Sequence, residues 1–147
     1  MTDEVALSRF IVDNSVWQRM RQPPVRAEVD RIRAAHGAEA LLVCAPVAAE
    51  AGFSARSAAD HDVVAGALAA FAQCSVHPSA TDVLDIQGAL FRNGLFRAVG
   101  ALDTVIAAYA VANRAAVLHY DRDFEHVARV HPGFLQRWIA PAGTLDG

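Results

Sequence analysis

The chain has 147 residues, of which 54% are hydrophobic and 20% are charged, and its formal net charge is −3. This length and composition predict one globular domain over residues 1–147, with a small polar tail at 141–147 that we expect to be frayed. They argue against a membrane-spanning protein, because no apolar run approaches the roughly 20 residues of a span, and against a broadly basic protein that coats nucleic acid.

The first half of the chain alternates short apolar runs with helical patterns. Phe10, Ile11 and Val12 are β-formers in an unbroken row, which is typical of a strand buried on both faces of a parallel sheet. We expect, in chain order, a strand at 10–12, a short helical turn at 14–20, a helix at 25–35, a strand at 41–44, a helix from 45 that carries Glu50, and a helix capped by Ser57 or Asp60 that runs to 72.

The second half continues the alternation. We expect a strand at 74–76, a helix capped by Ser79 or Thr81 that runs to 91, a helix at 101–113, a strand at 116–119, a helix at 124–130 and a last short strand at 137–139. Strands that alternate with helices imply right-handed crossovers and a sheet covered on both faces. The sequence therefore predicts an α/β fold with a mostly parallel central sheet.

Four carboxylates stand where such a fold brings residues together. Asp13 follows the first strand, Glu50 lies in the helix after the second, Asp103 lies near the start of the long helix, and Asp121 follows the fourth strand. Each acid is embedded in apolar sequence, where an unpaired charge is costly, and clustered carboxylates raise one another's pKa unless a cation joins them. A hard divalent ion, Mg²⁺ or Mn²⁺, resolves both problems and leaves positions open for a phosphate. Phosphodiester hydrolysis is the chemistry that fits best.

Each acid also has an ordinary structural interpretation. Asp103 can be a helix cap, Glu50 can be a surface residue, and Asp121 and Asp123 can bracket a turn. Asp13 has the weakest such alternative, because ligands gather beyond the carboxyl ends of strands in open α/β sheets. The co-occurrence of the four acids carries more weight than any one of them.

The remaining polar signals are less specific. Cys44 and Cys74 lie in apolar sequence, which suits buried free thiols in a reducing compartment, and no secretory signal is evident, so we expect a cytoplasmic protein. The histidines, among them His119, His126 and His131, show no metal-binding spacing and are expected at surface or capping positions. All 13 basic residues are arginine, which codon bias explains, although arginine forks also bind phosphates.

Two stretches resemble a known family. The opening Ile-Val-Asp-Asn-Ser-Val-Trp at 11–17 and the block from Arg97 to Phe124, with the order of the acids, look like a PIN domain and, more narrowly, like the VapC toxins of bacterial toxin–antitoxin pairs. The resemblance implies a three-layer α/β/α sandwich and an endoribonuclease, dependent on Mg²⁺ or Mn²⁺, that cleaves tRNA or ribosomal RNA. It also implies a cognate antitoxin partner and a homodimer.

The resemblance assigns roles residue by residue. It implies that four acids bind the metal and orient the attacking water, namely Asp13, Glu50, Asp103 and Asp121. Ser15 matches the hydroxyl residue that supports the first acid, whereas Asn14 stands where the family usually has threonine or serine. Tyr120 also departs from the family pattern, and the choice between Asp121 and Asp123 as fourth ligand stays open. Asp121 is preferred, because Phe124 then falls at the family's anchoring position.

Arginines flank these acids in the sequence. Arg92 and Arg97 precede Asp103, and Arg19, Arg21 and Arg122 flank Asp13 and Asp121, so they are candidate contacts to RNA phosphates or else ordinary solvated side chains. The main alternative function is a PIN-fold module that binds RNA or a protein without turnover. A phosphatase with Asp13 as nucleophile ranks last, because it lacks a second acid two residues later and a lysine.

Overall fold

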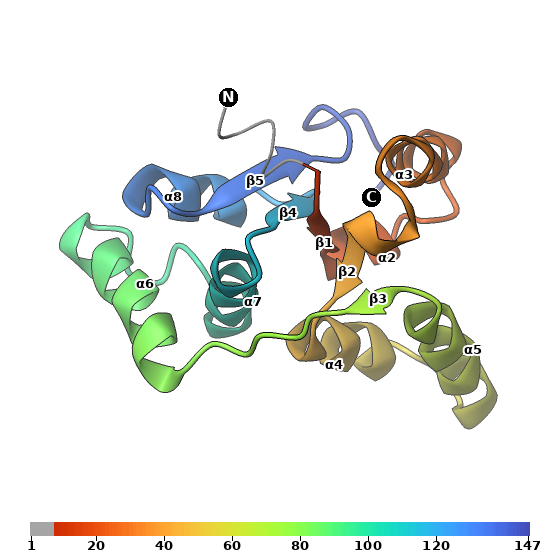
Figure 1. Ribbon diagram of the computed structural model, residues 1–147, viewed down its shortest axis with the longest axis horizontal. Coiled ribbons are helices and arrows are strands. Elements are labelled where there is room, and N and C mark those ends of the chain that lie inside the picture. The colour runs from red at the N-terminus through yellow and green to blue at the C-terminus, as the bar shows by residue number, and fades with distance from the viewer. Residues whose placement is uncertain (1–7) are drawn as a thin grey trace.

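A computed structural model describes residues 8–147 as a five-stranded sheet with helices on both faces (Figure 1). The strand order is β3-β2-β1-β4-β5, and every adjacent pair is parallel. The strands are β1 (Phe10–Val12), β2 (Leu41–Val43), β3 (Ala72–Gln73), β4 (Ala116–His119) and β5 (Leu135–Trp138). The expected α/β/α sandwich with a mostly parallel sheet is confirmed.

The helices occupy the positions that the alternation predicts. They are α2 (Asn14–Trp17), α3 (Pro23–His36), α4 (Ala45–Phe53), α5 (Ala58–Ala69), α6 (Ala80–Arg92), α7 (Ala101–Ala112) and α8 (Asp123–Val130), with a 3₁₀ turn η1 (Ala38–Ala40) before β2. Two expected caps are present, because Ser57 accepts a hydrogen bond from the amide of Asp60, and Ser79 and Asp82 form a reciprocal capping box.

The sheet buries a different core on each face. Ile11, Leu42 and Val117 point toward α6, α7 and α8, whereas Phe10 and Leu118 point toward α3. This division follows from the period of two along a strand, which sends successive side chains to opposite faces. The central strands β1 and β4 are therefore fully buried, and their carboxyl ends are fixed against each other.

The structure corrects two strand positions. The third strand lies at Ala72–Gln73 and not at 74–76, and the last strand begins at Leu135 and not at 137. The Asn113 side chain explains the first difference, because it binds both backbone groups of Val76, at 3.1 Å to the amide and 2.8 Å to the carbonyl. Those groups are thereby withdrawn from strand pairing.

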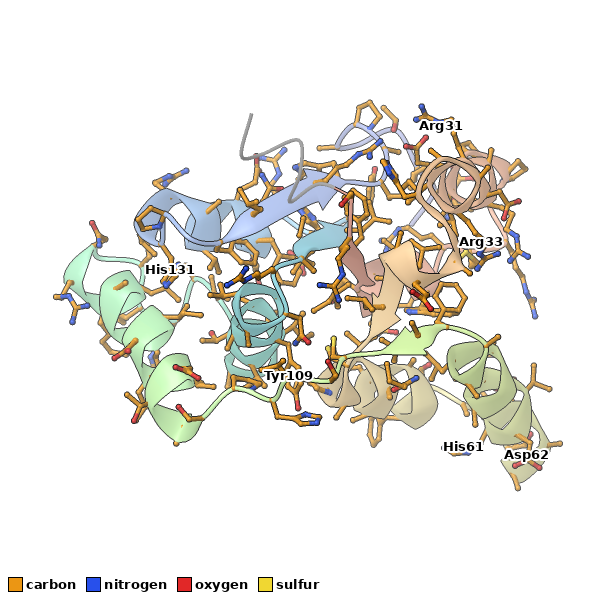
Figure 2. The ribbon with its side chains drawn as sticks, in the orientation of Figure 1. Arg31, Arg33, His61, Asp62, Tyr109 and His131 are labelled. Atoms are coloured by element: carbon orange, nitrogen blue, oxygen red, sulfur yellow. The ribbon has the colours of Figure 1, made fainter. Side chains whose placement is uncertain are left out.

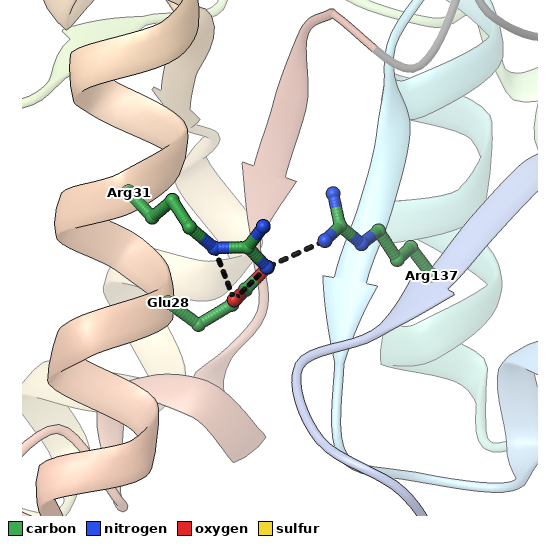
Figure 3. Close-up of polar contacts among 3 residues, drawn as sticks. All are labelled: Glu28, Arg31 and Arg137. Atoms are coloured by element: carbon green, nitrogen blue, oxygen red, sulfur yellow. Dashed lines mark hydrogen bonds and ion pairs between the residues drawn. The ribbon is translucent and has the colours of Figure 1, made fainter.

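Helix α3 is joined to the edge strand β5 by charged side chains. Figure 3 shows Glu28 of α3 between Arg31 of the same helix and Arg137 of β5, and Glu28 forms ion pairs with both. The residue Glu28 is the best shielded of the three, with a side chain 14% exposed against 35% for Arg137 and 70% for Arg31. This contact crosses from the helical layer to the sheet.

Several simpler expectations can also be compared with the structure. Cys44 and Cys74 are both buried and free, as expected. Residues 141–147, which we expected to be frayed, do make contacts with the body of the domain: the amide of Leu145 donates to the Tyr120 hydroxyl, and Gln22 exchanges two hydrogen bonds with the backbone of Asp146. Within residues 8–147, none of the helices combines the length and the apolar character needed to cross a membrane.

Candidate active site

The candidate site lies beyond the carboxyl ends of β1 and β4, where α4 and α7 also present acidic residues. Asp13 directly follows β1, and its carboxylate caps α2. Only 3% of Asp13 is exposed, although it carries a carboxylate. A charge so deeply buried requires compensation by hydrogen bonds or a cation.

Ser15 provides part of that compensation. Its hydroxyl donates to Oδ2 of Asp13 at 2.6 Å, and its amide donates to the same oxygen at 3.0 Å. The hydroxyl oxygen also accepts a bond from the amide of Tyr120 at 2.8 Å, so Ser15 joins the ends of β1 and β4. The other carboxylate oxygen of Asp13, Oδ1, is buried and has no hydrogen-bond partner. An orphaned carboxylate oxygen of this kind is suited to bind a cation.

The predicted acids converge around Asp103. Ligand oxygens of Asp13, Glu50 and Asp103 all lie within 4.8 Å of one another, and a second group with the same spacing consists of Asp103, Asp121 and Asp123. Asp103 belongs to both groups. The structure thus places both residues of the open choice, Asp121 and Asp123, beside Asp103, and the amide of Asp123 donates to Oδ1 of Asp121 at 3.0 Å.

The electrostatics of the cluster favour a bound cation. Burial, followed by the negative charges of Asp13, Asp121, Glu50 and Asp123, raises the pKa of Asp103 to about 7. Burial is also the largest cause of the raised pKa of Asp13, which hydrogen bonds from Ser15 partly offset. The pKa of Glu50 and of Asp123 is raised in the same direction, again mainly by burial. A divalent ion would relieve this repulsion.

The donor set identifies the kind of ion that the cluster suits. Both groups consist of carboxylates alone, with no histidine or cysteine, and hard oxygen donors favour Mg²⁺ or Mn²⁺ over zinc. Figure 2 shows His61 and His131 at opposite ends of the molecule, so these two histidines cannot share a site. The residues present therefore fit the expected metal.

One expectation about the histidines is wrong. His119, the last residue of β4, is completely buried and not at the surface. The rings of Phe124 and Trp138 pack against its imidazole with centroids 5.0 and 4.9 Å away. Its burial is tolerated because both ring nitrogens form hydrogen bonds, Nδ1 with the amide of Asp121 and Nε2 with the Gln136 side chain. The sequence signal was a polar residue at the end of a wholly apolar strand.

The candidate RNA-binding arginines differ in how freely they can bind. Arg92, Arg97 and Arg122 are exposed. Arg19 is only half exposed, donates a 2.8 Å hydrogen bond to the carbonyl of Ser15 and places its guanidinium 4.8 Å from the centre of the Tyr120 ring. Arg19 thus packs against the rim of the site, while the guanidinium groups of the other three form no hydrogen bond or ion pair with residues 8–147.

Asn14, the residue that departs from the family pattern, borders a cavity of about 470 Å³ between α2, α3, α4 and α5. Trp17 and Phe71 also line this cavity, with ring centroids 4.7 Å apart. The side-chain oxygen of Asn14 is buried without a hydrogen-bond partner. Asn14 is the first residue of α2 and directly follows Asp13 in the sequence, so it lies beside the acidic cluster.

Comparison with known sequences agrees with this geometry. The family model described as "PIN domain" matches residues 10–130. The chain is 36% identical over 139 residues to "Ribonuclease VapC18" of Mycobacterium tuberculosis, covering 92% of this chain and 98% of the relative. It is 34% identical over 142 residues to "Ribonuclease VapC51" of the same species, covering 94% and 98%.

Solved structures share the fold at lower sequence identity. A DNA-bound VapBC from Salmonella typhimurium matches with a TM-score of 0.69 and 18% identity, over 90% of this chain and 98% of the other. VapBC2 from Rickettsia felis, bound to a DNA fragment from its promoter, matches with a TM-score of 0.68 and 15% identity, over 88% and 97%. At these identities the likeness supports the fold alone.

Proposed function

The chain belongs to the PIN domain family and, within it, to the VapC ribonucleases, and from this premise we propose that it is a metal-dependent endoribonuclease and the toxin of a toxin–antitoxin pair. The observation that carries the metal dependence is the shared position of Asp103 in two groups of three carboxylates. Such an arrangement could hold one or two neighbouring cations, as in metal-assisted hydrolysis of a phosphodiester.

The roles of the residues follow from their contacts. Asp13, Glu50 and Asp103 would hold one ion, and Asp103 with Asp121 and Asp123 would hold a second. When bound, Mg²⁺ or Mn²⁺ supplies Lewis-acid chemistry at water and phosphate. Ser15 fixes one oxygen of Asp13 and leaves Oδ1 free to face the site. No histidine belongs to either group, so we assign the orientation of the attacking water to the carboxylates.

RNA contact is assigned to the exposed arginines. Arg92 and Arg97 lie at the end of α6 and in the segment before α7, which carries Asp103, and Arg122 lies between Asp121 and Asp123. Guanidinium groups beside a metal-neutralised acidic floor can hold the phosphates that flank the scissile bond. Arg19 packs on the ring of Tyr120 and in this way contributes to the shape of the rim of the site.

We also propose the partners and compartment that accompany this function. An antitoxin protein would inhibit the enzyme by covering the acidic site, and the enzyme would act in the cytoplasm as a homodimer.

Exposed apolar side chains on and after α6 support a protein contact at this surface, since Leu84, Phe91 and Phe96 are each more than half exposed. Sedimentation of the purified chain tests the dimer directly.

The central test is RNA cleavage by purified protein with Mg²⁺ or Mn²⁺. Asp13→Asn and Asp103→Asn should each lower the cleavage rate at least about 100-fold, because each removes a negatively charged ligand. Asp62→Asn is the matched control, since Asp62 is an exposed acid on α5 and lies away from α7 in Figure 2. If the two site variants cut RNA as fast as the wild type, the proposed mechanism is wrong.

The alternative, a PIN-fold binding module without turnover, makes the opposite prediction for the same protein. Calorimetry would then detect no binding of Mn²⁺ at millimolar concentration, while RNA binding is retained. The intact acids at every expected position favour the enzyme.

A further inference from the structure

Behind the acidic cluster, a series of hydrogen bonds centred on the buried side chain of His119 runs from β5 through β4 to the backbone amide of Asp121. Gln136 of β5 contacts Nε2 of His119 at 2.6 Å, and Nδ1 of His119 accepts the amide proton of Asp121 at 3.0 Å. His119 lies on β4, which is hydrogen-bonded to β5 along its whole length. These hydrogen bonds thus connect the edge strand of the sheet to Asp121, a member of the set formed by Asp103, Asp121 and Asp123.

The donors and acceptors in these hydrogen bonds determine which ring nitrogen of His119 carries the proton. A backbone amide can only donate, so Nδ1 of His119 must carry a lone pair and no proton. The carbonyl oxygen of Gln136 can only accept, so Nε2 must carry the proton. The neutral tautomer with its proton on Nε2 satisfies both contacts, whereas the other tautomer would break the contact with the amide of Asp121.

The surroundings leave His119 no freedom to change its orientation. The ring is completely buried between Phe124 and Trp138. The backbone amide of Tyr120, the residue between His119 and Asp121, donates separately to the Ser15 hydroxyl. Two consecutive amides after β4 are therefore bound by side chains, and the direction in which the Asp121 carboxylate leaves the backbone is fixed.

We propose that His119, held as the Nε2–H tautomer by Gln136, is the positioning residue that directs Asp121 toward Asp103. The proposal rests on the proposed function, since it assumes that Asp121 helps to hold the metal. His119 touches neither RNA nor metal in this scheme. It accepts one amide proton and so sets the geometry of the group formed by Asp103, Asp121 and Asp123.

The first test needs no variant. Long-range ¹H–¹⁵N NMR spectra of the wild-type protein report which ring nitrogen of each histidine is protonated. We expect His119 to show Nε2–H and an unprotonated Nδ1, with or without added Mg²⁺. An Nδ1–H tautomer or a doubly protonated ring would overturn the proposal, and this result is independent of whether the protein cleaves RNA.

The second test compares variants of His119 by their affinity for Mn²⁺, measured by electron paramagnetic resonance. His119→Leu removes the acceptor and should weaken Mn²⁺ binding about 10-fold or more, the usual effect of losing a group that orients a ligand. His119→Asn places an amide oxygen near the position of Nδ1 and should restore affinity to within about threefold of wild type. Trp138→Phe is the control, because it changes the packing around His119 and keeps the acceptor.

Kinetics separate positioning from general destabilisation. His119→Leu should lower kcat for RNA cleavage about 10-fold or more with little change in KM, because the arginines that contact RNA are not altered. Equal losses in His119→Leu, His119→Asn and Trp138→Phe would mean a purely structural role and overturn the proposal, as would wild-type Mn²⁺ affinity in a folded His119→Leu. Absence of metal binding by the wild type would instead refute the proposed function. This result differs from the two outcomes that would overturn only the role of His119.

Discussion

At the scale of single residues, Asp103 is the acid whose ionisation most affects the metal-free protein. Its pKa rises from 3.8 to about 7 through burial and four neighbouring carboxylates. A carboxyl whose folded pKa exceeds its unfolded pKa binds protons more tightly in the native state. The metal-free protein therefore loses stability from this group as the pH rises from about 4 to 7, and the loss is complete above pH 7.

Asp103→Asn should consequently stabilise the metal-free protein at pH 8. We expect a gain of about 1–2 kcal/mol, which is reduced from the full value of the shift because the side chain is partly open to solvent. Urea denaturation in the presence of a chelator measures the free energy of unfolding of the variant and the wild type at pH 8 and at pH 4. The difference between the two proteins should vanish at pH 4. An equal difference at both pH values would indicate a packing effect and not a charge effect.

Ser15 is a second residue with a measurable effect. Ser15→Ala removes the hydroxyl that joins Asp13 to the amide of Tyr120, and leaves that amide without its partner. We expect about 1–2 kcal/mol lower stability and about 10-fold lower kcat/KM for RNA cleavage. Ser15→Thr keeps the hydroxyl and should remain within a few-fold of wild type. A fully active Ser15→Ala variant would show that Asp13 needs no such support.

At the scale of elements, Glu28 links α3 to β5. Because it is well shielded and paired with two arginines, Glu28→Ala should lower the free energy of unfolding by about 1–2 kcal/mol. Arg31→Ala removes only the exposed partner and should have a much smaller effect, because solvent screens an exposed ion pair. Chemical denaturation at low and moderate salt measures both. Comparable losses in the two variants would contradict the role assigned to the Glu28–Arg137 pair.

The elements also show how far local sequence determines this fold. The buried strands β1, β2 and β4 could be predicted because each contains an apolar run, which in β4 ends at His119. The caps at Ser57 and Ser79 follow from local side-chain chemistry. β3 could not be predicted, because Ala72 and Gln73 carry no strand pattern and their pairing depends on the neighbouring β2. The strand does not extend to Val76, because the backbone of Val76 binds the side chain of Asn113, which is distant in sequence.

The acidic site was predictable to a similar degree and for similar reasons. An acid after a buried strand or early in a helix is visible in the sequence, so Asp13, Asp103 and Asp121 could be identified. The position of Asp123 beside Asp103 depends on the turn after β4, where His119 binds the amide of Asp121 and is itself bound by Gln136, 17 residues away. No local pattern encodes such a contact.

At the scale of the whole molecule, metal binding and folding should be coupled. The strands and helices that carry the acids come from both halves of the chain, so the complete cluster exists only in the native state. An ion that binds the native state alone stabilises it by RT ln(1 + [L]/Kd), which is about 2.7 kcal/mol at 100 times Kd. For a domain of 147 residues each kcal/mol raises Tm by about 2–4 °C.

Saturating Mn²⁺ should therefore raise the Tm of the wild type by roughly 5–10 °C at pH 8. Asp13→Asn and Asp103→Asn should lose most of this shift, and Asp62→Asn should keep it, because Asp62 lies on α5 outside both carboxylate groups. Lowering the pH through 7 should diminish the shift in the wild type, since protons then compete with Mn²⁺ for Asp103. Thermal denaturation with and without a chelator measures each case. A shift that is independent of pH and of Asp103 would locate the stabilising ion elsewhere on the protein.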